Sequence, residues 1–425
     1  MVKAPGNPVL FIVADAFRHD YLVPENTPYL CKMSEEGFYA EKLKPNYGFC
    51  ERTEMFTGTR PDENGLFTAI TFDKKGSAFK KAKTDIALLS LFDWKTALLR
   101  RYIRRFYRDW FKKIRRIQQP VYEIPLKLLP RLGLTEDRVD LHLSEWSDYT
   151  GVETIFDVFR SEGKKFYFDT FASLTMPMGT DEDRVKVSIR AFSEKKSDLY
   201  LVYIGDGDGT GHAFGPHSKE ALAMTKRVDD RIKKITAGFF KEYPEGTLFV
   251  IGDHGMLEVK TTIDAGCLIE NRAKDAGLKP FRDFDYFLDS PLVRMWFHSD
   301  KARSVFGEFF TSSEEFNEKG KVLTEEIARE MHVPPPGKGY GDIIWMAAPG
   351  TLVFPDFFHY RHVCRGMHGY DTSVSGQKGF CIAAGKNITP GKTGEIELID
   401  VCPALCHLTG IRTPEKNQGK DFLKS

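Results

Sequence analysis

The chain alternates between short runs of β-branched and aromatic residues and longer segments whose apolar residues recur with helical spacing. The clearest runs are Val9 to Val13, Lys165 to Phe168, Leu199 to Ile204, Thr247 to Ile251 and Gly379 to Ala383. Continuous apolar runs of this length are typical of strands that are buried on both faces of a parallel sheet. The sequence therefore predicts an α/β fold with a doubly wound, largely parallel central sheet flanked by helices.

Two segments depart from this alternation. Residues 73 to 150 are rich in Lys and Arg, and residues 258 to 360 have a looser pattern that includes Pro334 to Pro336. We expect a single catalytic domain over residues 1 to 425. Within it, residues 73 to 150 are predicted to form a basic helical insertion, and residues 258 to 360 a cap segment.

One helical pattern within the insertion, residues 97 to 117, is both apolar and strongly basic. Its apolar positions are Leu98, Leu99, Tyr102, Ile103, Phe106, Tyr107, Trp110, Phe111, Ile114 and Ile117. Nine Arg and Lys residues between Arg100 and Arg116 occupy the other positions. Such a helix is typical of proteins that bind an anionic membrane surface, and it also fits a helix packed on the sheet with a solvated basic face. Both interpretations stay open.

Charge and cysteine content limit the partners and the compartment. The formal net charge of +1 provides no overall attraction for nucleic acid, so we expect no nucleic-acid binding. The seven cysteines are scattered and include no CxxC pair, which suits a reducing compartment. The sequence shows neither a secretory signal nor an apolar run long enough to span a membrane. We expect a cytoplasmic protein, or one held at the membrane periphery through residues 97 to 117; no segment indicates an oligomeric state.

Acidic residues follow three of the predicted strands. Ligands bind outside the carboxyl ends of strands in α/β sheets, so these carboxylates should converge. The residues from Asp208 to His212 are expected to form a tight glycine turn, and a glycine-flanked loop places another histidine near the end of the chain. The expected cluster comprises three carboxylates and three imidazoles: Asp15, Asp208, Asp253, His212, His254 and His368.

This set of side chains is sufficient for two divalent metal ions. Carboxylate oxygens combined with imidazoles suit zinc better than calcium or magnesium. Two such ions, roughly 3.5 to 4 Å apart, clamp the attacking and leaving oxygens during displacement at phosphorus. The sequence therefore predicts a metal-dependent hydrolase of phosphate esters.

The same residues resemble the landmarks of the alkaline phosphatase superfamily, and most closely those of its type I nucleotide pyrophosphatase/phosphodiesterase branch. The landmarks run in the expected order over nearly the whole chain: Asp15 within Ala14 to Arg18, Thr57 with Gly58, Pro61 and Gly65, Asp208 to Pro216, Asp253 to Gly255, and His368 to Asp371. The resemblance implies an alkaline phosphatase-like fold and phosphodiesterase activity. It also implies that Asp208, His212 and His368 hold one zinc ion, and that Asp15, Asp253 and His254 hold the other.

The chain departs from this family at the nucleophile. The family places a Thr or Ser nine residues before the Thr57-Gly58 element, where this chain has Gly48. We predict that Cys50 is the nucleophile and also touches the second metal ion, because cations and a helix N-terminus favour a thiolate. Arg52 is predicted to neutralise the substrate phosphate. Thr53 or a metal-bound hydroxide is the alternative attacking group, and Cys50 is then a buried structural residue.

Two other functions stay open. A sulfatase of the same superfamily also uses a cysteine, but the segment Cys50 to Glu54 lacks the proline of the sulfatase motif, and three histidines favour zinc over calcium. A non-catalytic membrane-surface binding module would explain the missing Thr or Ser, but it gives no reason for six metal ligands. For the enzyme we expect a lipid-linked or nucleotide-linked phosphate ester as substrate, with monoester and diester both open.

Overall fold

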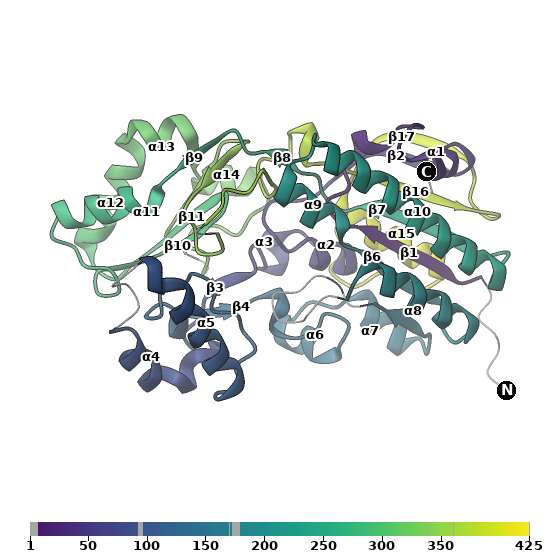
Figure 1. Cartoon of the computed structure of the whole chain (residues 1–425). Coiled ribbons are helices and arrows are strands. Elements are labelled where there is room, and N and C mark those ends of the chain that lie inside the picture. The colour runs from purple at the N-terminus through teal and green to yellow at the C-terminus, as the bar shows by residue number, and fades with distance from the viewer. Residues whose placement is uncertain are drawn as a thin grey trace. The chain divides into compact units, whose positions relative to one another are not determined.

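The computed structural model describes residues 7–91, 97–169, 171, 179–337, 339–359 and 361–424, with only the backbone of residues 97–101. The chain divides into two compact units (Figure 1). The first comprises Met1–Asn64, Val139–Glu258 and Arg365–Ser425, and the second comprises Gly65–Arg138 and Val259–Cys364. The predicted insertion thus belongs to the second unit only up to Arg138, and almost all of the predicted cap segment belongs to that unit.

A sheet of order β17-β2-β16-β7-β1-β6-β5 forms the centre of the first unit. Its strands are β1 (Val9–Ala14), β2 (Phe38–Lys44), β5 (Phe166–Phe168), β6 (Leu199–Ile204), β7 (Thr247–Gly252), β16 (Gly379–Gly385) and β17 (Gly391–Glu397). β16 pairs antiparallel with β2 and β7, and the other pairs described for this sheet are parallel. The predicted doubly wound, largely parallel α/β sheet is therefore confirmed.

Helices cover both faces of this sheet. The α-helices described in the first unit are α1 (Pro28–Glu36), α2 (Glu51–Thr57), α3 (Pro61–Asn64), α6 (Ser144–Thr150), α7 (Ile155–Ser161), α8 (Asp181–Ser193), α9 (Asp206–Phe214), α10 (Lys219–Glu242) and α15 (Val401–Thr409). Two short strands, β8 (Leu257–Glu258) and β15 (Gly366–Met367), pair antiparallel with each other. All of these elements belong to the first unit.

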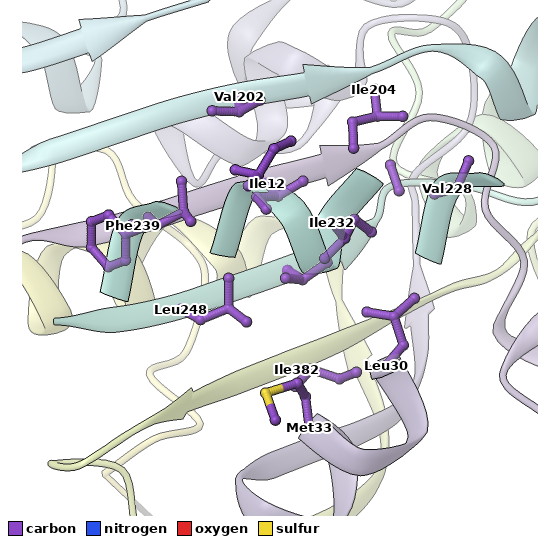
Figure 2. Close-up of a cluster of buried hydrophobic side chains, with 14 of the residues drawn as sticks. Ile12, Leu30, Met33, Val202, Ile204, Val228, Ile232, Phe239, Leu248 and Ile382 are labelled. Carbon is purple, nitrogen blue, oxygen red and sulfur yellow. The ribbon is translucent and has the colours of Figure 1, made fainter. Parts of the chain in front are cut away.

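The alternation of side chains along the strands decides which helices each face contacts. Leu10 and Ile12 of β1 belong to a buried cluster that also contains residues of α1, α8 and α10. Figure 2 shows Ile12 and other strand side chains of this cluster around α10, and Ile382 beside Met33 of α1. The intervening Phe11 points the other way and meets Phe56 of α2 edge to face, with ring centroids 6.2 Å apart. Because both faces are apolar at the centre of the sheet, β1, β6, β7 and β16 are almost continuously hydrophobic, as the sequence pattern predicted.

The second unit contains an antiparallel sheet of order β10-β11-β13-β12. The strands of that sheet are β10 (Phe284–Asp289), β11 (Leu292–Phe297), β12 (Gly320–Val322) and β13 (Ile343–Ala347). Two further pairs of strands lie in this unit: β3 (Ile70–Phe72) with β4 (Leu132–Leu134), and β9 (Thr261–Ile263) with β14 (Thr351–Val353). Its helices are α4 (Lys83–Leu89), α5 (Ala97–Lys113), α11 (Ala265–Asp275), α12 (Asp300–Ser312), α13 (Glu314–Lys319) and α14 (Glu325–Glu330).

The basic pattern at residues 97 to 117 forms α5, which ends at Lys113. Tyr107 and Phe111 are buried, whereas Tyr102, Phe106 and Ile114 are 70%, 52% and 60% exposed. The predicted apolar face is thus only partly used for packing within the unit. The predicted positions Leu98, Leu99, Arg100 and Arg101 lie outside the described side chains. Within the described residues, no helix combines the length and apolar character needed to cross a bilayer.

Candidate active site

Three adjacent strands deliver acidic residues to one edge of the sheet. β1 lies between β6 and β7, and its last residue, Ala14, is in register with Ile204 of β6 and Gly252 of β7. Asp15 and Asp253 directly follow Ala14 and Gly252, and Asp208 lies four residues beyond Ile204. Because the three strands are parallel, their carboxyl ends coincide, which is where α/β folds place their ligands.

The segment that follows β6 is a helix and not the glycine turn that the sequence predicts. α9 begins at Asp206, so Asp208 and His212 are four residues apart on the same helical face. An added Cβ at Gly207 would lie 2.2 Å from the backbone oxygen of Asp15, so glycine lets α9 approach the end of β1 closely. Asp206 instead pairs with Arg227 and Arg231. The prediction of a turn was wrong because the glycines here permit close packing without ending the helix.

Two histidines are oriented by backbone carbonyls. His212 Nδ1 lies 2.9 Å from the Gly366 oxygen, and His254 Nδ1 lies 2.8 Å from the Gly255 oxygen. A carbonyl only accepts hydrogen bonds, so each Nδ1 is the donor and each Nε2 is left to face the carboxylates. His212 Nε2 is 3.0 Å from Asp208 Oδ1, and His254 Nε2 is 3.0 Å from an oxygen of the buried Asp15. This arrangement is typical of histidines that bind metal ions.

The remaining predicted ligands complete the cluster. His368 Nε2 lies 3.5 Å from Asp208 Oδ1, and the His368 ring stacks on that of His254 with centroids 4.1 Å apart. Asp253 Oδ1 is 3.9 Å from His254 Nε2 and accepts hydrogen bonds from the backbone nitrogens of Ala16 and His254. All six side chains predicted as carboxylate or imidazole ligands therefore gather at this edge.

The cluster has the spacing of a metal site. Among the described residues, three groups have ligand atoms within 4.8 Å of one another: Asp208 with His212 and His368, Asp15 with Asp208 and His254, and Glu51 with His254 and His368. Ligand atoms bound tetrahedrally at ~2.0–2.1 Å from a zinc ion lie roughly 3.3 Å apart. The contacts of 3.0 to 3.5 Å measured here are of that size. The donor set therefore fits divalent metal ions.

The pKa values of the buried groups in the cluster are also those of a site that favours bound cations. Burial raises the pKa of Asp253 to about 8. The charges of Asp15 and Glu51 act in the same direction, and the charge of His254 acts against them. Burial would lower the pKa of His254, but Asp253, Asp15 and Glu51 raise it well above its usual value. Burial, together with the neighbouring His254, lowers the pKa of His368. Burial and the neighbouring carboxylates thus make it harder for Asp253 to ionise, and bound cations favour its charged form.

The predicted nucleophile and its neighbours lie at the start of α2. Cys50 is the N-cap residue of the helix and is only 2% exposed, and Thr53 is fully buried. Arg52 is partly exposed. Cys50 belongs to none of the three ligand groups found among the described residues, whereas the next residue, Glu51, belongs to one.

The sequence matches the family described as type I phosphodiesterase / nucleotide pyrophosphatase over residues 9–371. The chain belongs to this family. The resemblance drawn from the ordered motifs is thereby confirmed, as is the alkaline phosphatase-like fold that it implied.

Relatives of this family member are distant in sequence. Human ectonucleotide pyrophosphatase/phosphodiesterase family member 7 is 26% identical over 262 residues, which cover 54% of this chain and 48% of the relative. A human bis(5'-adenosyl)-triphosphatase is 22% identical over 422 residues, which cover 97% of this chain and 80% of the relative. The chain thus spans about half the length of the first curated relatives that it matches.

Solved structures of the family share the fold. Human ectonucleotide pyrophosphatase/phosphodiesterase 5 superposes with a TM-score of 0.68 at 18% identity and 97% coverage of both chains. An inactive variant of the murine protein, in complex with AMP, gives a TM-score of 0.68 at 18% identity, with 98% of both chains covered. These structures establish the architecture of this family member.

Two residues of the site were missed from the sequence. One is Glu51, an acidic residue at the start of α2 whose place beside the predicted nucleophile Cys50 gives it a sequence signal. The other is Tyr203, whose buried hydroxyl donates a hydrogen bond to Asp15 Oδ2. No local signal marks Tyr203, because an aromatic residue within a strand is expected in any core.

Proposed function

We propose that the chain hydrolyses phosphodiester bonds at a site that binds two zinc ions. The observation that carries this proposal is the convergence of the predicted carboxylates and imidazoles at one sheet edge, in a member of a family named for this reaction. One ion would be held by Asp208, His212 and His368, and the other by Asp15, Asp253 and His254.

The donor set supports zinc in particular. Imidazole nitrogens combined with carboxylates are typical of zinc, whereas calcium and magnesium sites are built mainly from oxygen atoms. When bound, the ions would stabilise the charge that develops on the phosphate and on the leaving oxygen. The backbone acceptors of His212 and His254 hold both rings with Nε2 directed into the cluster, so the protein provides the ligand orientation in advance.

Cys50 is the proposed nucleophile. Its sulfur would attack phosphorus, forming an S–P bond as the P–O bond to the leaving group breaks. Water would then break the S–P bond, releasing the phosphate monoester and returning the thiol. Arg52 is proposed to offset the negative charge of the phosphate. Thr53 and a water molecule are the alternative attacking groups.

The proposed substrate is a nucleotide-linked or lipid-linked phosphate ester. Nucleotides are favoured by the names of similar proteins, which include a bis(5'-adenosyl)-triphosphatase and a complex with AMP. The family match favours phosphate ester hydrolysis over the sulfatase alternative and over a non-catalytic binding module.

A lipid-linked substrate is favoured by the surface of α5. Tyr102, Phe106 and Ile114 are exposed next to exposed Arg105, Arg108, Lys112 and Lys113. Aromatic and basic side chains on one helix surface suit the headgroup region of an anionic membrane. We propose that this surface docks on anionic lipid, through the apolar side chains and through charge attraction.

One set of measurements tests the enzyme. Zinc content by mass spectrometry and hydrolysis of bis-p-nitrophenyl phosphate, p-nitrophenyl phosphate and p-nitrophenyl sulfate are compared for the native chain, Asp208→Ala, Cys50→Ala and the exposed control Asp230→Ala. We expect two zinc ions per native chain and no sulfate cleavage. Phosphate ester cleavage should fall by roughly 10³- to 10⁶-fold in Cys50→Ala. Activity that survives in Cys50→Ala assigns the attack to Thr53 or water, and a native chain without metal and without activity contradicts the proposal.

A further inference from the structure

Glu51 lies where the two proposed ligand sets meet. Its carboxylate oxygen and the ring nitrogens of His254 and His368 lie within 4.8 Å of one another. His368 belongs to the set with Asp208, and His254 to the set with Asp15. Their stacked rings, with centroids 4.1 Å apart, bring the two sets together, so a carboxylate beside both rings lies next to both proposed ligand sets.

The fold explains why this side chain reaches the site. Phe56 fixes α2 on β1 through its contact with Phe11. Glu51 precedes Phe56 by about one and a half helical turns and is the first residue of the helix. It is partly buried, and its charge acts on both Asp253 and His254. The neighbouring Cys50 is almost fully buried and joins no ligand group among the described residues.

We propose that Glu51 is a metal ligand at the junction of the two sets, and that its charge makes the site prefer singly charged phosphodiesters to doubly charged monoesters. This inference rests on the proposed metal site. The carboxylates of Asp15, Asp208 and Asp253 offset three of the four positive charges on a pair of divalent ions, and Glu51 offsets the fourth, so Glu51→Gln leaves the site one charge more positive whatever the charges of Cys50 and Arg52. A site without that excess charge attracts a dianion less than one that keeps it.

The first test is metal binding. Zinc affinity and stoichiometry are measured for the native chain, Glu51→Gln, Glu51→Asp and Glu63→Gln, an exposed glutamate of α3 that serves as the matched control. Glu51→Gln should lose one zinc ion or bind it at least ~100-fold more weakly, a loss at or above that seen when the partners of metal ligands are removed. The zinc affinity of Glu51→Asp should lie between those of Glu51→Gln and the native chain, and the affinity of Glu63→Gln should match that of the native chain. Circular dichroism shows whether each variant is folded.

Cobalt substitution distinguishes Glu51 from its neighbour. A thiolate ligand gives a near-ultraviolet charge-transfer band with Co²⁺, and a carboxylate does not. We expect no such band in the native chain and unchanged metal affinity in Cys50→Ser, so that Glu51 takes the place of Cys50 in the contact with the second metal ion that the sequence predicted. A band that disappears in Cys50→Ser would show that the thiolate is the ligand and would overturn the proposal. So would unchanged zinc affinity in folded Glu51→Gln.

The second test is substrate preference at saturating zinc. The ratio of kcat/KM for bis-p-nitrophenyl phosphate to that for p-nitrophenyl phosphate should fall by roughly tenfold or more in Glu51→Gln, because a negative charge is removed beside the phosphate. An unchanged ratio contradicts the role in specificity. If the native chain binds metal and cleaves esters, and Glu51→Gln has the same zinc affinity and the same ratio, only the role of Glu51 is refuted. A native chain without metal refutes the proposed function as well.

Discussion

At the residue scale, the site depends on side chains that orient the ligands. Tyr203 donates a hydrogen bond to Asp15 Oδ2, while the other oxygen of Asp15 lies 3.0 Å from His254 Nε2. The hydroxyl therefore fixes which oxygen faces the metal position. Tyr203→Phe should weaken the affinity for zinc at the proposed site that includes Asp15 by roughly 10- to 100-fold, measured by competition with a chelator.

Tyr200 on the same strand provides the control for this prediction. Its hydroxyl is also buried and bonds to the Tyr243 hydroxyl at 2.7 Å, within the apolar layer beneath α10. Tyr200→Phe removes a comparable hydrogen bond and should leave zinc affinity unchanged. Equal affinities in Tyr203→Phe and the native chain would show that Asp15 needs no such partner.

The residues that were predictable are those whose position follows from chain order. Asp15 and Asp253 come directly after buried strands, and parallel pairing alone brings them to one edge. Tyr203 and Glu51 reach the site through the packing of side chains from elements distant in sequence, and periodicity carries no information about that packing. The assignment of Cys50 as nucleophile stays a prediction, because it depends on reactivity.

At the element scale, the clearest difference between pattern and structure concerns α5. Its sequence predicts one apolar face. Tyr107 and Phe111 on this face are buried, whereas Tyr102 and Phe106 are exposed. α9 differs in the opposite way, since its glycines predicted a turn and it forms a helix. The first case shows that local pattern does not reveal how much of an apolar face is packed, and the second that glycines alone do not decide between a turn and a helix.

The exposed part of α5 predicts binding to anionic vesicles. The native chain should cosediment with vesicles containing phosphatidylglycerol and not with pure phosphatidylcholine, and binding should weaken as salt screens the basic residues. Replacing Tyr102 and Phe106 by serine should reduce binding at least roughly tenfold, because two apolar side chains no longer enter the lipid.

Leu222→Ser is the matched control for the vesicle experiment. Leu222 is 48% exposed on α10, and its loss should not change binding. If the double variant and the native chain cosediment equally, the exposed residues of α5 serve another purpose. If neither vesicle type binds the native chain, the surface is simply a solvated basic face, as the alternative interpretation of the sequence holds.

At the scale of the whole molecule, metal binding and stability should be linked in one unit only. All of the proposed ligands, from Asp15 to His368, belong to the first unit, which has its own buried core around the parallel sheet. A ligand that binds only the folded state stabilises it by about 2.7 kcal/mol at a concentration 100-fold above its Kd. Bound zinc should therefore raise the free energy of unfolding of the first unit.

Hydrogen exchange measured by mass spectrometry, with and without a chelator, resolves where that stabilisation acts. Chelation should speed exchange in the segments after β1, β6 and β7 and around His368, and it should remove the zinc-dependent protection of the strands that end there. Peptides from β10, β11 and β13 in the second unit should exchange at the same rate under both conditions. Equal acceleration in both units would show that the metal site stabilises the chain as one cooperative body. No acceleration in either would mean that the carboxylate cluster is stable without metal.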